Sequence, residues 1–390
     1  MFEFGYILNK RYIFIKPLNS GAFSCVWLLF DINKNNVCVG KIINEEDKET
    51  GENEIKILKK LKKLLNKENN TLFNNLLLFN ETIYFKDQII IIEEYQNLTL
   101  KDLIYDYKLS EVDKSIIIKN LKNQILPVLN FLKQNKILHT DIKPENIFIK
   151  SNVYNFDGLI KEFIKELQNI KCKQKQKNKT IQNIILKYKK EFLNNYINEI
   201  NNDLDNDSIL DNDSISDSDI SINTDSDIHS DYDENNEIDE FLMDKIIEYK
   251  NKINDLNYEN KKQINFDINN LIYSIGDFGN AIDYSNDEEN NKINNQQFHD
   301  LQTRYYRHPN IIMRSNNILN SDFYAFDIII KEINNQNLPF DPSKSKGETT
   351  DHNHLKLLIN NNYCLNCEKG RKTNIFFNYD KILGGYYLGK

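Results

Sequence analysis

The sequence has 390 residues, enough for one large domain or two domains of ordinary size. Its net charge of −8 is uneven: residues 201–240 hold 15 acidic and no basic side chains, which leaves +7 for the rest of the chain. No apolar run approaches the roughly 18 residues of a membrane span. Five scattered cysteines, an odd number, argue against a disulfide framework. We therefore expect a soluble intracellular protein with no membrane partner.

Two kinds of periodicity organise the first part of the chain. Residues 10–43 alternate between apolar and polar positions and are interrupted by the turns "NSG" and "NKNN", which predicts antiparallel strands. Helical spacing follows over residues 50–66, and the apolar run "IIIIEEY" at 89–95 predicts a further strand. A long helix is predicted over residues 111–135. The inward faces of the two helices are Glu54, Leu58, Leu61 and Leu65 in the first, and Ile117, Leu121, Ile125, Val128 and Leu132 in the second.

The composition changes between about residue 155 and residue 270. Residues 203–227 are rich in Asp and Ser and nearly free of aromatic side chains, so they cannot bury enough apolar area to offset the entropy of ordering. We expect a disordered centre, with helical shoulders at "FDGLIKEFIKEL" (156–167) and "EIDEFLMDKIIEY" (237–249). This predicts that residues 160–265 can be deleted without loss of the folded protein.

Five short elements carry polar groups in a particular order. The turn "LNSGAFSCVWL" (18–28) contains small residues that allow backbone N–H groups to approach phosphates, although most such turns are only turns. Lys41 in "CVGKI" follows on a strand, and Glu54 on the next helix offers it an opposite charge. "HTDIKPEN" (139–146) and "GDFG" (276–279) complete the series.

These residue types suit phosphoryl transfer. Asp141 can accept the proton of a hydroxyl group, and Lys143 can stabilise the migrating phosphoryl group. Asn146 and Asp277 supply the hard oxygen ligands that Mg²⁺ prefers. Taken alone, "HTDIKPEN" could be an Asp-Pro-Asn turn, but the order of all five elements favours the catalytic interpretation.

The motifs resemble those of protein kinases, and among them the SR-protein kinases. The resemblance is carried by "FSCVW" (23–27), "LHTDIKPENI" (138–147), "DFGNA" (277–281) and "QTRYYR" (302–307). The LAMMER-type kinases share "HTD", but the "GNA" and a long insert favour the SR-protein kinases. The resemblance implies an α+β, two-lobed protein-kinase fold. Its parts are an N-lobe at 10–98, the start of the C-lobe at 99–150, an insert at 151–270, and an activation segment with a shortened C-lobe at 271–390.

The resemblance also implies the activity. We expect a monomeric serine/threonine kinase that uses ATP and Mg²⁺, acts on basic Ser-rich or Arg/Ser-rich proteins, and binds no nucleic acid directly. Its expected location is the cytoplasm or the nucleus, of a host cell if the protein is viral. The alternative is a pseudokinase scaffold without turnover, which is favoured by the shortened C-lobe, by Asn19 in the phosphate loop and by Asn310.

The remaining residues of the expected nucleotide site follow from the same resemblance. Ile92 would be the gatekeeper, and the backbone of Glu93 and Tyr95 would face adenine. Thr303 would brace Asp141 and Lys143, and Asp322 would anchor the catalytic loop. The phosphate loop, roof and floor of the pocket would be Asn19, Gly21, Ser24, Val26, Val39 and Phe148.

Three further features complete the sequence-based expectations. Thr140 stands where many kinases have an arginine that grips a phosphorylated activation loop, so we expect activity without loop phosphorylation. Cys364 and Cys367 have the types of zinc ligands, but reduced cysteines in a loop are the more common alternative. The run "KCKQKQKNK" (171–179) is interpreted as solvated lysines rather than a nuclear-import or nucleic-acid patch.

Overall fold

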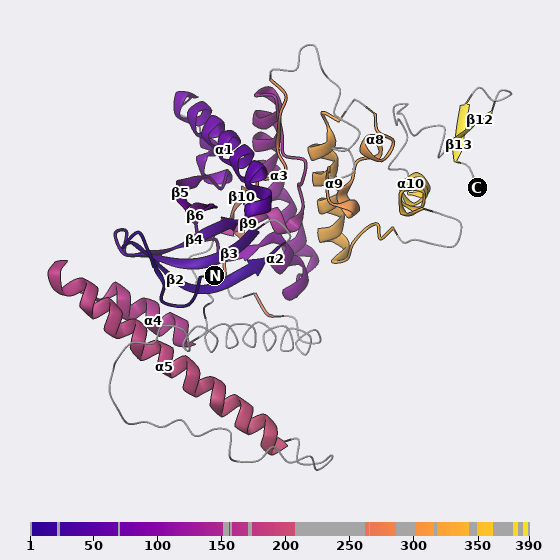
Figure 1. Ribbon diagram of the computed structural model, residues 1–390. Helices are drawn as coiled ribbons and strands as arrows, with labels where there is room; N and C mark the ends of the chain where they lie inside the picture. The colour runs from indigo at the N-terminus through magenta and orange to yellow at the C-terminus, as the bar shows by residue number, and fades with distance from the viewer. Residues whose placement is uncertain are drawn as a thin grey trace. The chain divides into compact units, whose positions relative to one another are not determined.

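The fold is described from a computed structural model (Figure 1). The described residues are 2–21, 24–68, 71–150, 156, 158–170, 174–206, 262–264, 266–285, 301–315, 318–342, 349–361, 377–380 and 385–388. Residues 207–261, which include the second helical shoulder and all of the predicted disordered centre except residues 203–206 at the end of a helix, lie outside this set, as do Cys364 and Cys367.

Strands dominate the first hundred residues and helices the remainder. The strands are β1 (Ile7–Leu8), β2 (Tyr12–Ser20), β3 (Ser24–Asp31), β4 (Asn36–Ile43), β5 (Phe79–Phe85), β6 (Gln88–Glu94), β7 (Leu98–Thr99), β8 (Ile137–Leu138), β9 (Ile147–Lys150), β10 (Ile272–Ile275), β11 (Ile282–Asp283), β12 (Phe377–Asp380) and β13 (Gly385–Leu388). The helices are α1 (Lys48–Glu68), α2 (Leu100–Asp106), α3 (Glu111–Gln134), α4 (Gly158–Gln168), α5 (Gln174–Asn206), α8 (Pro309–Ile312), α9 (Ser321–Asn335) and α10 (Thr350–Asn360). The strand order of the largest sheet is β1-β2-β3-β4-β6-β5. The predicted strands over 10–43 and the two predicted helices are confirmed.

The chain divides into two compact units. The first contains Met1–Asn19, Trp27–Cys38 and Phe156–Asn260, and the second contains Ser20–Val26, Val39–Asn155 and Lys261–Lys390. All the individual residues predicted for the catalytic and nucleotide site except Asn19 lie in the second unit. The two units are described separately below.

The core of the second unit is built from α1, α3 and α9 together with β6, β9 and β10. The apolar side chains predicted to face inward from α1 and α3 are at most 1% exposed. These residues share one hydrophobic cluster with Ile89 and Ile91 of β6 and with Ile328 and Ile329 of α9. Helix α3 packs against α9 (Figure 1). A continuous apolar core therefore supports the short strands that carry the motif residues.

The first unit contains an ordered part of the insert. Helices α4 and α5 lie side by side (Figure 1), and the first of them coincides with the predicted shoulder at 156–167. Phe163 of α4 contacts the ring of Tyr188 on α5, with centroids 5.1 Å apart, and the ring of Phe4 at 5.0 Å. Gly5 (φ +82°) lies so close to Ile185 that a Cβ atom at this position would overlap its side chain.

These contacts correct the expectation that residues 160–265 are dispensable for the fold. Two amphipathic helices can bury apolar area even where the flanking tract cannot. Their buried side chains, at most 6% exposed, are Ile160, Phe163, Ile164, Leu167, Ile181, Ile185 and Tyr188. Deletion from residue 160 would expose the N-terminal aromatic residues that these helices cover.

The basic run 171–179 is only partly described. Helix α5 begins within it, at Gln174; Lys179 is exposed, whereas Lys177 donates to the carbonyl oxygen of Ile32 (3.2 Å), so the interpretation as solvated lysines stays a prediction. None of the described helices is long and apolar enough to cross a membrane.

We predict that Phe163→Ala lowers the free energy of unfolding by about 3–5 kcal/mol, because a fully buried ring is replaced by a cavity. Leu186→Ala on α5 is the matched control: this side chain is 57% exposed, and its loss should change stability by less than about 0.5 kcal/mol. Urea unfolding followed by circular dichroism measures both. Equal midpoints for the two variants would contradict the packing described here.

Candidate active site

One short strand pair brings the predicted catalytic motifs together. β9 follows the "HTDIKPEN" loop and pairs antiparallel with β10, with Phe148 opposite Ser274 and Ile147 opposite Ile275. The N–H of Gly276 then donates to the carbonyl oxygen of Asn146 (3.1 Å). This register places Asp277, directly after β10, beside the end of the catalytic loop. The two motifs are about 130 residues apart in the sequence, so only the pairing of strands joins them.

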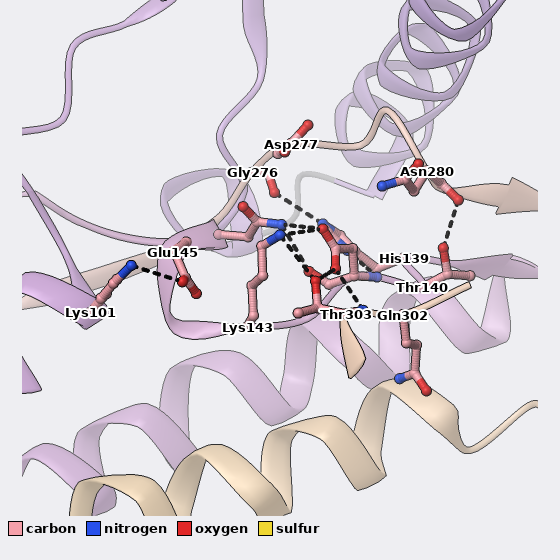
Figure 2. A network of polar contacts seen from close by, with 12 residues as sticks. Lys101, His139, Thr140, Lys143, Glu145, Gly276, Asp277, Asn280, Gln302 and Thr303 are labelled. Carbon is pink, nitrogen blue, oxygen red and sulfur yellow. Dashed lines mark hydrogen bonds and ion pairs between the residues drawn. The ribbon is translucent and has the colours of Figure 1, made fainter. Parts of the chain in front are cut away.

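The carboxylate of Asp141 is held by three neighbouring side chains (Figure 2). Thr303 donates its hydroxyl to Oδ1 of Asp141 (2.7 Å), and Lys143 lies 2.8 Å from Oδ2. Lys143 also donates to the Thr303 hydroxyl (3.2 Å), and the amide of Asn146 donates to Oδ2 of Asp141 (3.1 Å). The four predicted catalytic residues therefore form one network, with Asp141 only 6% exposed.

Asp322 of α9 holds the backbone of the predicted catalytic loop, as expected from the sequence. Its two carboxylate oxygens accept the backbone N–H groups of His139 (2.7 Å) and Thr140 (2.9 Å). Asp322 is 3% exposed, and burial raises its pKa above the usual value. A buried carboxylate that receives two backbone donors is satisfied and rigid, so it can set the path of the loop.

Thr140 adopts a backbone conformation that β-branched residues rarely reach, with φ +61°. Three hydrogen bonds hold it there. Besides the bond to Asp322, its carbonyl oxygen accepts the N–H of Gln302 (2.9 Å), and its hydroxyl donates to the carbonyl oxygen of Asn280 (2.6 Å). Figure 2 shows this last contact. Thr140 therefore links the catalytic loop to the segments at 280 and 302 by neutral hydrogen bonds, without any added phosphate.

Lys41 lies among carboxylates. Its ammonium group is 2.9 and 2.8 Å from the two oxygens of Glu54 and 2.7 Å from Oδ1 of Asp277. Burial alone would lower the pKa of Lys41, but the carboxylates of Glu54 and Asp277 outweigh this effect and raise it. Lys41 is therefore permanently charged, and the ion pair with Glu54 fixes its position.

Asp277 has the properties of a metal ligand. Burial would raise the pKa of its carboxyl group, but the ammonium group of Lys41 holds that pKa below its usual range. The side chain keeps 41% exposure, so solvent and ligands can reach its oxygens. A carboxylate and the amide oxygen of Asn146 fit Mg²⁺, which takes few protein ligands and completes its shell with water and phosphate. The described residues contain no cluster of three or more His, Cys, Asp or Glu side chains for another kind of metal.

Glycine is required just before Asp277. A Cβ atom at Gly276 would lie 2.8 Å from the ring of Phe148 and 3.0 Å from the side chain of Leu77. Phe148 therefore packs directly beneath the backbone that leads to Asp277. This packing places Phe148 next to the expected metal ligand, and its role as the floor of a nucleotide pocket stays a prediction.

The structure corrects the residue expected as gatekeeper. Ile89 and Ile91 of β6 face the core around α1, and alternation along a strand puts Glu93, not Ile92, on that same face. Glu93 is 8% exposed. Burial raises its pKa to about 8, with a further contribution from the carboxylate of Glu54 and an opposing one from Lys41. The side chain that borders Lys41 at the end of β6 is therefore an acid.

The structure brings the expected nucleotide-binding residues together only in part. The N–H of Gly21 donates to the carbonyl oxygen of Ser24 (2.9 Å), which closes the tight turn expected of a phosphate loop. Asn19 belongs to the first compact unit, so its place at the site stays a prediction. The same holds for contacts of Val26 and Val39, and of the Tyr95 backbone, with a nucleotide.

Sequence reasoning missed several groups that position the catalytic loop. His139 is fully buried: its Nε2 donates to the carbonyl oxygen of Gly276 (3.0 Å), and its Nδ1 accepts the N–H of Asp141 (3.3 Å). Gln302 is 3% exposed and donates through its side chain to the carbonyl oxygen of Ser321 (2.9 Å). Both residues stand inside the quoted motifs, and a polar residue directly after a leucine was the available signal.

The site thus combines a lysine–glutamate pair, a braced aspartate and an accessible aspartate beside the lysine, which is the arrangement expected of a protein kinase. Residues 12–191 match the family model of the protein kinase domain. This part of the chain is therefore similar to the protein kinase domain, and the expected α+β kinase fold is confirmed. The motifs at 276–279 and 302–307 lie beyond the matched residues and join the site through the contacts described above.

Relatives with this domain are serine/threonine protein kinases. The probable serine/threonine-protein kinase clkA of Dictyostelium discoideum is 29% identical over 156 residues, 40% of this chain and 16% of that protein. The serine/threonine-protein kinase SKY1 of Saccharomyces cerevisiae is 28% identical over 182 residues, 45% of this chain and 24% of that protein. The serine/threonine-protein kinase prpf4B of D. discoideum is 29% identical over 151 residues, 38% and 18% respectively. The matches span a quarter or less of each relative's length.

We predict that Glu93 makes the stability of the protein depend on pH. The folded state holds the Glu93 proton up to a pKa of about 8, whereas the unfolded chain releases it near 4.5. Between these values the folded state binds more protons, so stability falls as the pH rises. The melting temperature of the wild type, relative to Glu93→Gln, should therefore decrease from pH 5 to pH 8. A difference that does not change with pH would contradict the buried position of Glu93.

Proposed function

We propose that the protein is a serine/threonine protein kinase that transfers the γ-phosphoryl group of ATP to protein hydroxyl groups with the help of Mg²⁺. The observation that carries the proposal is the arrangement of Asp141, whose carboxylate is held by the Thr303 hydroxyl and the Lys143 ammonium group. The second cluster contains Lys41, Glu54 and Asp277. Its ammonium group can contact the phosphates of a nucleotide, and the carboxylate of Asp277 can bind Mg²⁺.

Asp141 is the proposed base. A serine or threonine hydroxyl that approaches its carboxylate can donate its proton as the bond to phosphorus forms. Lys143, 2.8 Å from the same carboxylate, can stabilise the negative charge that spreads over the transferred group. Thr303 fixes both side chains, so little reorganisation is needed at the moment of reaction.

Asp277 and Asn146 are the proposed magnesium ligands. When bound, Mg²⁺ would neutralise phosphate charge and align the phosphoryl group with the attacking oxygen. Asp277 is accessible, and its carboxylate stays ionised because Lys41 lies 2.7 Å away. Lys41, oriented by Glu54, can then contact the phosphates. The backbone of Glu93, at the end of β6, and of Tyr95, directly after the strand, is the proposed contact for adenine.

The substrate class is proposed on two grounds. The sequence motifs resemble those of SR-protein kinases, and SKY1 is among the relatives. We therefore expect basic Ser-containing proteins as substrates.

We predict that Asp141→Asn lowers the transfer rate by about 10²–10⁴-fold and leaves ATP affinity within about twofold, because Asp141 acts on the hydroxyl group and not on the nucleotide. Asp277→Ala should weaken Mg·ATP binding as well as turnover, because it removes a metal ligand. Steady-state kinetics with a basic Ser-containing peptide, combined with calorimetric ATP binding, separates the two effects.

The control is Thr303→Ser, which keeps the hydroxyl group that reaches Asp141 and should retain most of the activity. If purified Asp141→Asn transfers phosphate at the wild-type rate, the assigned base is wrong. If the wild type binds ATP but transfers nothing to any protein or peptide, the pseudokinase alternative is correct.

We predict that activity survives complete dephosphorylation of the protein. Thr140 carries no charge for a phosphorylated loop, and its hydroxyl already bonds to the carbonyl oxygen of Asn280 (2.6 Å). Treatment with a phosphatase, followed by its removal, should leave kcat within about twofold; mass spectrometry confirms the dephosphorylated state. A loss of more than tenfold that returns on rephosphorylation would show that a phosphate, and not Thr140, orders the segment.

A further inference from the structure

Helix α1 carries Glu54, so its orientation decides whether Lys41 is held in place. A helix that packs beside a sheet can rotate or shift, and only specific contacts fix one arrangement. Contacts between α1 and the segment that follows Asp277 provide such a constraint. They involve residues that the motifs did not identify.

Besides Glu54, whose carboxylate accepts the backbone N–H of Phe278, two residues of α1 reach this segment. The side-chain amide of Asn53 donates to the carbonyl oxygen of Ala281 (3.0 Å). About two turns further along α1, the ammonium group of Lys60 lies 2.8 Å from Oδ1 of Asp283. Ser285 completes this arrangement: its hydroxyl donates to Oδ1 of Asp283 (2.6 Å), and Lys60 contacts the same hydroxyl (3.3 Å).

The segment that receives these contacts is itself anchored. Asp283 lies in β11, which pairs with β8 and so stands opposite Ile137, directly before the catalytic loop. The N–H of Tyr284 donates to the carbonyl oxygen of Lys136 (3.0 Å). Lys60 therefore connects α1 not to a free loop but to the strand pair that leads into the "HTD" motif.

The Lys60–Asp283 pair is more than an ordinary surface ion pair. The two side chains are 27% and 17% exposed, and Asp283 accepts two further hydrogen bonds from Ser285, through its N–H (3.0 Å) and its hydroxyl. Such a half-buried, multiply bonded carboxylate has a fixed direction, whereas exposed pairs contribute little. Among the described contacts of Lys60 and Asp283, none reaches the Asp141 network, so the pair does not act on the proposed base directly.

We propose that Lys60 and Asp283 are positioning residues: their ion pair holds α1 in the orientation in which Glu54 meets Lys41. The inference rests on the proposed function for its catalytic consequence, because Lys41 is there the phosphate-binding residue. Loss of the pair leaves Asn53 and the Lys41–Glu54 pair itself to hold α1. The helix then samples other orientations, and Lys41 spends less time in position.

The test compares Lys60→Met, Asp283→Asn, the double variant and the charge-exchanged pair Lys60→Asp with Asp283→Lys. Lys59→Met is the matched control, because this neighbouring lysine is exposed. Each single variant should bind Mg·ADP and turn over about threefold to tenfold less well, with an unchanged KM for the peptide. The double variant should be no worse than the worse single one, and the exchanged pair should recover at least half of the loss.

Hydrogen exchange supplies a readout that needs no kinase activity. Backbone amides of α1 between residues 53 and 60 should exchange about tenfold faster in Asp283→Asn, while those of α3 remain unchanged. This outcome supports the positioning role even if the wild type transfers no phosphate. Failure of the proposed function can therefore be distinguished from failure of the positioning role. Unchanged exchange in α1, or strictly additive effects of the two single substitutions, would overturn the proposal.

Discussion

The candidate active site of this protein depends on one buried carboxylate. Asp322 accepts the N–H groups of His139 and Thr140, and thereby fixes a loop that has no regular hydrogen-bond ladder of its own. From that loop the chain presents Asp141 and Asn146, and then enters β9, whose pairing with β10 places Asp277. An uncompensated buried charge would be costly, but two backbone donors satisfy this one. The positions of Asp141 and Asn146 therefore depend on the contact between Asp322 and the backbone of the loop.

Unfavourable backbone conformations and charged side chains are both concentrated in the candidate active site. Thr140, Asp277 and Gln302 all have positive φ angles near +60°, a conformation that is unfavourable for residues other than glycine. Each is held by contacts within the site, and together they direct Asp141 and Asp277 toward one region. Glu93 adds a third carboxylate near Lys41, beyond the two that pair with it. The arrangement costs stability, which the apolar core of α1, α3 and α9 offsets.

Most residues of the candidate site could be predicted from the sequence motifs, because the chemistry of phosphoryl transfer restricts the residue types at these positions. Asp141, Lys143, Asn146, Asp277, Lys41 and Glu54 could be predicted in this way, and the structure brings them together in two clusters. The gatekeeper could not be predicted. The four consecutive isoleucines in "QIIIIEE" show no alternation of apolar and polar residues, so the residue on the face of the strand toward α1 was assigned one position too early. The ordered helix α5 was missed because its Lys- and Asn-rich sequence hides a narrow apolar stripe. The Lys60–Asp283 pair joins residues 223 positions apart, and only tertiary structure reveals it.

The central claim, that this site transfers phosphate, is tested most directly by a single-turnover experiment. Excess purified protein is mixed with ATP labelled in the γ-phosphate, Mg²⁺ and a basic Ser-containing peptide, and the products are identified by mass spectrometry. The account predicts stoichiometric phosphoserine on the peptide, formed only when Mg²⁺ is present. Unchanged ATP and peptide, with nucleotide bound to the protein, would contradict it.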